Sequence, residues 1–390
     1  MFSDKFVFSQ LVSFLDRSLF NRVVAKYGGD RYVKHFTCWN QLLALMFGQL
    51  SNREGLRDLI IAFEAHRSKC YHLGVGRNVT RSNLAKANER RNCKIFEEFA
   101  CSIIDVARKK RACKKFNFVG HVYAFDSTTI DLCLELFEWA RFRTTKSGVK
   151  VHTLYDVETQ VPSFILITEA KVNDVRAMDY IPYEPGSYYV FDRAYNDFKR
   201  LAHIDACRSY FVVRSKTNML FEVVCDKGCD NASVLRDCEI RLTGTNTCEA
   251  YPKPLRMVVF HDDEEDRDFT YITNAGRISA TRVAELYKNR WYVELFFKWL
   301  KQHLKIKKFW GTTENAVRIQ ISVAIITYCL IAIVQNEMKL SRSAYEMLQI
   351  LSISLTDKTP LQELFSCERS CDNEKETDLT LDLFNNLFLC

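Results

Sequence analysis

The sequence lacks the features that mark secreted and membrane proteins. Its 15 cysteines are odd in number and follow no regular spacing, which argues against a disulfide framework. The first residues, MFSDKFVFSQLVSFLDRS, carry charges inside their apolar run, unlike a cleavable signal peptide. The longest apolar run, residues 319–334, is shorter than the roughly 20 residues of a membrane span and contains Gln320 and Ser322, which favours a buried core helix. The sequence therefore predicts a cytoplasmic protein with no membrane partner.

Cysteine pairs of the CxxC type, common in zinc modules, are also missing. The one set of cysteines that could hold zinc is Cys225, Cys229, Cys238 and Cys248. Their spacing differs from that of the usual modules, so a zinc site is not favoured.

Positive charge, by contrast, is present in excess and is unevenly distributed. The formal net charge is +7, and the tail beyond Cys367 is acidic. Basic clusters suit a polyanionic partner, although each alone is also compatible with a solvated face. The clusters comprise Arg108, Lys109, Lys110, Arg111, Lys114 and Lys115; Arg141, Arg143, Lys146 and Lys150; and Lys301, Lys305, Lys307 and Lys308.

The first 115 residues show helical periodicity. Leucines recur at helical spacing in residues 42–50 and 56–63, and glycines precede a polar, basic segment, TRSNLAKANERRN, at residues 80–92. Ser82 is a candidate N-cap for this segment. The segment suits DNA binding, with a plain helical packing domain as the alternative; its candidate cations are Arg81, Lys86, Arg90 and Arg91, and its candidate base readers are Asn83 and Asn88.

From about Phe116 the pattern changes to strands. One apolar run ends at Asp126, residues 148–170 read as a hairpin that turns near 158–160, and a strand at 188–191 is followed by Asp192. A helix at 198–206 and a strand at 210–213 complete the order expected of an RNase H-like α/β fold. Aspartates at the ends of separate strands could then meet at one sheet edge. Asp156 and Asp174 compete for this role, but the first lies beside the hairpin turn and the second at a helix start.

A charged stripe lies on the predicted helix at residues 279–310. Glu294 stands between one arginine before it and lysines after it, an arrangement that suits a metal ion bound to phosphate. The alternative is a solvated face, on which Glu294 and Lys298 would form a helix-stabilising pair worth about 0.3–0.5 kcal/mol. The stripe consists of Tyr287, Arg290, Glu294, Lys298 and Lys301.

Four of these residues match the pattern Tyr-x2-Arg-x3-Glu-x6-Lys, through Tyr287, Arg290, Glu294 and Lys301. This pattern resembles the signature of the YREK-type bacterial insertion-sequence transposases, a group of DDE recombinases. The resemblance implies that Asp126, Asp192 and Glu294 are catalytic and hold two Mg²⁺ ions, with Mn²⁺ as a substitute. It also implies that Tyr287, Arg290, Lys298 and Lys301 contact DNA phosphates.

The resemblance further implies an organisation and an activity. We expect a helical, DNA-binding domain at 1–115, a catalytic core with a mixed sheet flanked by helices at 116–213 and 279–345, a β-rich insertion at 214–278, and a helical segment with an acidic tail at 346–390. The expected activity is cut-and-paste transposition by a nucleoid-associated homodimer, which acts on double-stranded DNA at terminal inverted repeats and at a target. A metal-dependent nuclease without strand transfer and a non-catalytic DNA-binding regulator remain alternatives.

Overall fold

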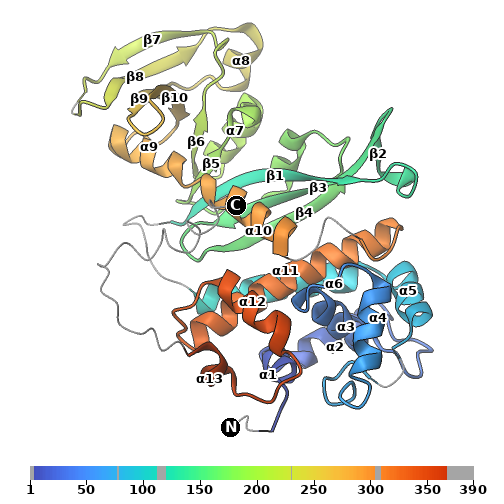
Figure 1. The fold of residues 1–390 in the computed structure, drawn as a ribbon. Helices are drawn as coiled ribbons and strands as arrows, with labels where there is room; N and C mark the ends of the chain where they lie inside the picture. The colour runs from blue at the N-terminus through green and yellow to red at the C-terminus, as the bar shows by residue number, and fades with distance from the viewer. Residues whose placement is uncertain (1–3, 77–78, 112–119, 230, 304–308, 367–390) are drawn as a thin grey trace. The chain divides into compact units, whose positions relative to one another are not determined.

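A computed structural model describes residues 4–76, 79–111, 120–229, 231–303 and 309–366 (Figure 1). These residues form two compact units. The first comprises Met1–Arg111, Ile130–Gly148 and Phe297–Cys390, and the second comprises Ala112–Thr129 and Val149–Phe296. Part of the predicted basic clusters (Lys114, Lys115, Lys305, Lys307 and Lys308) and the acidic tail lie outside the described residues.

The first unit is helical, as the sequence predicts for its N-terminal part. Its centre is α11, which contacts α3, α5, α6 and α12. The helices are α1 (Val7–Val12), α2 (Arg17–Lys26), α3 (Cys38–Leu50), α4 (Leu56–Ala65), α5 (Arg81–Arg90), α6 (Lys94–Lys110), α11 (Glu314–Glu337), α12 (Ala344–Ser354) and α13 (Leu361–Phe365).

Helix α11 contains the apolar run and is buried, which confirms the predicted core helix. By length and composition it could cross a membrane, but 89% of its most apolar window is buried within the protein. A helix that is apolar all round needs such a core. Its few polar groups are paired there: Thr327 Oγ1 donates to Gln49 Oε1 (3.1 Å), and Gln49 Nε2 donates to the Gln320 carbonyl (3.2 Å).

Helix α5 forms at the predicted basic segment, but two details of the prediction were wrong. The N-cap is Thr80, whose side chain accepts from the Asn83 N–H, and Ser82 lies inside the helix. Asn88 is only 3% exposed, and its Oδ1 accepts a hydrogen bond from Gln41 Nε2 at 2.7 Å. Asn88 therefore joins α5 to α3 and is not placed to read a base.

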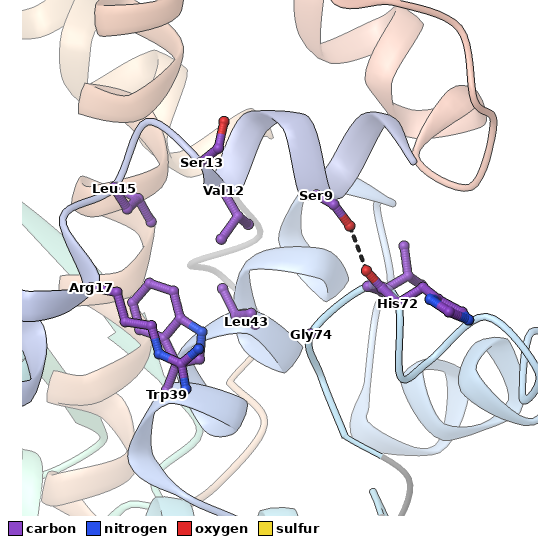
Figure 2. Close-up of a pocket in the computed structure, with 10 residues that line it drawn as sticks. Ser9, Val12, Ser13, Leu15, Arg17, Trp39, Leu43, His72 and Gly74 are labelled. Carbon is purple, nitrogen blue, oxygen red and sulfur yellow. Dashed lines mark hydrogen bonds between the residues drawn. The ribbon is translucent and has the colours of Figure 1, made fainter. Parts of the chain in front are cut away.

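A hollow of about 260 Å³ lies between α1, the start of α2 and α3 (Figure 2). Ser9 closes one side by donating to the His72 carbonyl at 2.7 Å. On the other side the Arg17 guanidinium lies 5.6 Å from the centre of the Trp39 ring. The walls between them are largely apolar, as Val12, Leu15 and Leu43 show.

The second unit is built on a mixed sheet, in which neighbouring strands follow the order β4-β3-β1-β5-β6. Strands β1, β5 and β6 run parallel to one another, while β3 and β4 form an antiparallel hairpin. This arrangement, flanked by helices, confirms the predicted RNase H-like class. The elements are β1 (Val122–Leu132), β3 (Lys146–Asp156), β4 (Val161–Glu169), η2 (Asp174–Tyr180), β5 (Tyr188–Phe191), η3 (Arg193–Tyr195), α7 (Phe198–Ala206) and β6 (Tyr210–Arg214). The short η1 (Glu138–Ala140) and β2 (Arg141–Arg143) belong to the first unit, where β2 pairs with the first residues of β3.

The segment predicted as a β-rich insertion extends this same sheet. Strand β10 (Arg267–Thr273) pairs antiparallel with β6, followed in the sheet by β9 (Leu255–Asp262), β8 (Val234–Leu242) and β7 (Phe221–Asp226); α8 (Thr245–Ala250) connects β8 to β9. The apolar pattern of this segment predicts strands at 221–224, 256–260 and 269–272, and β7, β9 and β10 confirm them. Strand β8 was not predicted, because charged residues interrupt its apolar positions.

One buried ion pair joins two strands of this extension. Arg256 on β9 donates from Nε and Nη2 to the two carboxylate oxygens of Asp237 on β8, at 2.8 and 2.6 Å. Its third nitrogen, Nη1, donates to the Ile278 carbonyl at 2.5 Å. Both side chains are more than nine-tenths buried. Arg256 therefore fixes β8, β9 and the chain that leads to α9 (Ala280–Lys288).

The helix predicted at 279–310 is wrong as a single element. The structure has two helices, α9 and α10 (Trp291–His303), with a break at Asn289 and Arg290. The Asn289 side chain donates to the Glu285 carbonyl at 2.7 Å, which occupies the acceptor that the Asn289 N–H would use in a regular helix. The N–H groups of Asn289 and Arg290 bond three residues back, so the chain tightens and turns there.

Candidate active site

Two predicted aspartates lie next to the pairing of the parallel strands β1 and β5. In this register Phe125 is paired with Phe191; Asp126 follows within β1, and Asp192 directly follows the end of β5. The prediction that Asp126 ends its strand was wrong, because β1 continues to Leu132. The two phenylalanine rings, 5.9 Å apart, belong to the buried core on one face of the sheet. Because side chains alternate along a strand, Asp126 points to the opposite face.

Arg290 connects Asp126 to the third predicted carboxylate, Glu294. Its Nη1 lies 3.2 Å from Asp126 Oδ2 and 2.6 Å from Glu294 Oε1. The break between α9 and α10 places Arg290 in the turn and Glu294 in the first turn of α10. One guanidinium nitrogen thus holds oxygens from a strand and from a helix that are far apart in the sequence.

Tyr287 connects the remaining aspartate to this group. It lies on α9 and is only 9% exposed, with its ring 4.7 Å from that of Tyr271. Its hydroxyl donates to Asp192 Oδ1 at the long distance of 3.4 Å, and the Arg290 guanidinium lies 5.8 Å from the centre of its ring. In this structure Tyr287 therefore contacts a carboxylate, and its predicted contact with DNA phosphates stays a prediction.

The carboxylates of the site lie close together and are partly buried, and both conditions affect the pKa of Asp126. Burial raises the pKa of Asp126 to about 6; the Ser127 N–H and Arg290 oppose this rise, and Glu294 and Asp192 add to it. Burial alone would lower the pKa of Arg290, but Tyr287, Glu294 and Asp126 raise it further than burial lowers it. The Arg290 Nε is buried and has no acceptor among the described residues. The site therefore favours additional positive charge and one further acceptor.

These residues fit a divalent cation by chemistry. Three carboxylates supply the hard oxygen donors that Mg²⁺ and Mn²⁺ prefer, against the single guanidinium of Arg290. Their oxygens do not all come within 4.8 Å of one another, because among the described residues only His121, Asp156 and Glu158 form such a group. The guanidinium stands between two of the donors, so a cation held by these oxygens would compete with Arg290 for them.

The two competing aspartates have other contacts. Asp156 is fully buried in the β3–β4 turn, where its Oδ1 accepts from the backbone N–H groups of Glu158 and Thr159. Asp174 accepts from Ser127 Oγ at 2.6 Å and pairs with Lys150 Nζ at 3.1 Å. Asp156 thus stabilises its turn, and Asp174 is linked through Ser127 to the strand that carries Asp126.

Two cations near Asp192 were not singled out from the sequence. A hollow of about 450 Å³ is lined by Asp192, Arg193 and the segment from Lys216 to Asn218. Arg193 follows Asp192 directly, and Lys216 comes just after β6, the parallel neighbour of β5. Ligands of open α/β sheets gather where parallel strands end, and this rule is the signal that could have found both residues.

Lys298 and Lys301 follow Glu294 on α10, at four and seven residues, in the part of the helix that belongs to the first unit. Both are partly buried. Their predicted contact with DNA phosphates stays a prediction.

Comparisons with known proteins find similarity to transposases. A family model described as "Transposase DDE domain" matches residues 118–330, and a model described as a domain of unknown function matches residues 3–76. A protein named as transposase y4zB in Sinorhizobium fredii is 35% identical over 256 residues, which cover 64% of this chain and 70% of that protein. The "Probable transposase for insertion sequence element IS5377" of Geobacillus stearothermophilus is 33% identical over 231 residues, covering 58% of this chain and 60% of that protein.

Among solved structures, the cryo-EM structure of the piggyBac transposase synaptic complex with hairpin DNA aligns with 89% of this chain and 79% of that chain. The TM-score is 0.45 and the identity 11%, values too low to support an assignment.

Proposed function

We propose that this chain, which belongs to the transposase DDE domain family and is therefore a transposase, binds the ends of its own insertion sequence, cleaves them and joins them to target DNA. The observation that carries the proposal is that Asp126 and Glu294 both pair with Arg290, beside Asp192. Asp192 directly follows Phe191, which is the register partner of Phe125. The match of Tyr287, Arg290, Glu294 and Lys301 to the YREK pattern supports the cut-and-paste type.

In the proposed chemistry, Asp126, Asp192 and Glu294 hold two Mg²⁺ ions, for which Mn²⁺ can substitute. When bound, such ions activate the attacking water or 3′-hydroxyl and stabilise the leaving oxygen. No residue of the chain needs to form a covalent bond to DNA.

The other residues of the site orient the substrate and the carboxylates. Tyr287 keeps Asp192 in place, while Arg290 is released from Asp126 and Glu294 and turns toward a DNA phosphate, which supplies the missing acceptor for its Nε. Arg193 and Lys216 line the hollow beside Asp192 and offer further contacts to phosphates. Lys298 and Lys301, farther along α10, bind DNA phosphates.

The predicted organisation completes the proposal. Residues 1–115 contribute DNA binding, 116–213 and 279–345 the catalytic core, 214–278 the insertion and 346–390 a C-terminal segment. Two copies hold the two terminal inverted repeats before they engage target DNA in the bacterial cytoplasm.

The test is cleavage of a supercoiled plasmid that carries the gene with its own flanking DNA. We expect cuts at the boundaries of the element with Mg²⁺ and none with EDTA, mapped by primer extension. Cuts at unrelated positions would identify a general nuclease. Binding to the ends without cleavage, in Mg²⁺ or Mn²⁺, would contradict the catalytic assignment and leave a regulator.

Arg290→Met should separate metal binding from cleavage. The guanidinium competes with the metal for Asp126 and Glu294, and charge-assisted hydrogen bonds contribute about 1.5–3 kcal/mol each. Losing this competition should tighten Mn²⁺ binding at least about tenfold, which corresponds to about 1.4 kcal/mol. Cleavage should nevertheless fall, because a phosphate contact is lost.

The measurement is calorimetric titration of Mn²⁺ without DNA. Arg282→Met on α9 is the control, since Arg282 pairs with the exposed Glu285. Weaker Mn²⁺ binding by Arg290→Met would show that Arg290 assembles the carboxylates and does not compete for them.

A further inference from the structure

A groove of about 730 Å³ crosses the first unit, far in sequence from the carboxylates. One wall is the segment that joins α2 to α3, and the other is the outer face of α5. Its lining residues include Arg31, Lys34, Lys86, Arg90 and Arg91, and no aspartate or glutamate.

Apart from Arg91, the cations of the groove are exposed and are not neutralised within the described part of the chain. Lys34, Lys86 and Arg90 are exposed and have no ion pair there, and Arg31 contacts only its neighbour Tyr32. Lys86 and Arg90 are four residues apart on α5, which places them on one face of the helix. Positive groups that converge on a groove without a carboxylate create a site for a polyanion.

The floor of the groove is fixed by hydrogen bonds. Arg91 donates from Nη1 to the Thr37 carbonyl (2.8 Å) and to Gln41 Oε1 (3.0 Å), and from Nη2 to the Phe36 carbonyl. The Gln41 amide in turn bonds Asn88 on α5. Arg91 therefore holds the two walls at a set separation and is not itself available to a ligand.

The α2–α3 segment also presents an aromatic side chain to solvent. Tyr32 is 88% exposed and has a φ of 62°, a left-handed backbone that is unfavourable for a side chain of this size. Arg31 lies 5.0 Å from the centre of its ring. Gly29 lets the segment lie against the core, because a Cβ there would collide with Ile95 and Cys38. A strained, exposed tyrosine between cations suits contact with a sugar or a base.

We propose that this groove is a binding surface for duplex DNA, in which Arg31, Lys34, Lys86 and Arg90 contact consecutive phosphates and Tyr32 packs against the sugar–base edge. The inference rests on the proposed function, which supplies DNA as the substrate. It assigns the DNA binding proposed for residues 1–115 to one groove of the helical unit, with named phosphate and sugar–base contacts.

The test is the salt dependence of binding by the full chain to a fluorescent duplex of the element's end, with EDTA present to prevent cleavage. The triple variant Lys34→Gln, Lys86→Gln, Arg90→Gln should bind at least about tenfold more weakly at moderate salt. The slope of log affinity against log salt should become shallower by about 2–3, because each phosphate contact contributes about 0.9. Tyr32→Ala should weaken binding and leave the slope unchanged, since the ring carries no charge.

The matched control is the triple variant Arg22→Gln, Arg67→Gln, Lys94→Gln, which removes the same charge from exposed positions of the first unit outside the groove lining. It should keep a slope closer to that of the wild type. Equal affinities and slopes for the two triple variants would overturn the groove assignment alone. Absence of duplex binding by the wild type would overturn both the groove assignment and the proposed function.

Discussion

Replacement of Glu294 by glutamine is expected to lower the rate of end cleavage at least about a thousandfold, which corresponds to about 4 kcal/mol of transition-state stabilisation. The amide keeps the shape of the side chain and an oxygen that can accept from Arg290. It loses the negative charge that a divalent cation requires, so the loss should appear in the chemical step while binding to DNA persists. Cleavage of the gene's flanking DNA and binding of an end duplex, measured in parallel, would separate the two.

The matched control is Glu285→Gln on α9, where the carboxylate is 56% exposed and pairs with Arg282. It should cleave at nearly the wild-type rate. Cleavage by Glu294→Gln within tenfold of the wild type, with the control unchanged, would remove Glu294 from the site. Asp174, which Ser127 links to the strand of Asp126, would then be the next residue to substitute.

Replacement of Arg256 by methionine is expected to lower the free energy of unfolding of the second unit by about 3–5 kcal/mol. Asp237 would be left buried without its partner, and the Ile278 carbonyl would lose a donor. Because the chain has two compact units, overall melting can mix their transitions. Hydrogen exchange of peptides from β8 and β9 in increasing urea reports the affected strands directly.

Two further variants make this prediction falsifiable. Arg241→Met is the control, since Arg241 forms an exposed pair with Glu222 at 3.6 Å and should change stability little. The double variant Arg256→Met, Asp237→Leu should recover much of the loss, because replacing both members of a buried pair by apolar residues is often neutral. A double variant no more stable than Arg256→Met would show that the hydrogen bond to Ile278 dominates.

The sequence predicted the central part of the sheet well. The strand at 188–191, the hairpin near 158–160 and the buried helix at 319–334 are dominated by local apolar pattern and turn residues, so short stretches of chain specify them. Strand β8 was missed because Arg236, Asp237, Glu239 and Arg241 mask its pattern. Its charges are accommodated by partners on neighbouring strands, and such partners are not visible in a local window.

The helical stripe was predicted on the wrong element. Tyr287, Arg290 and Glu294 were chosen as neighbours on one continuous helix, whereas the structure places them on α9, in a turn and on α10. The break depends on the side chain of Asn289, whose amide competes with the backbone for one carbonyl. A single asparagine hardly changes the spacing of apolar residues from which a helix is predicted, so this spacing could not reveal the turn at Asn289.

By itself, the sequence determined the identity of the acidic and basic residues, and it located the strand that contains Asp126 and the strand that ends just before Asp192, because alternation and turn chemistry are local properties. The tertiary structure decided how these residues meet. The β1–β5 register sets the two aspartates side by side, and a turn in the chain brings Arg290 between Asp126 and Glu294. It also decided that Asn88 and Arg91 hold the floor of the groove while Tyr32 stands exposed. These outcomes depend on contacts between distant segments, whose geometry is fixed only when the core packs.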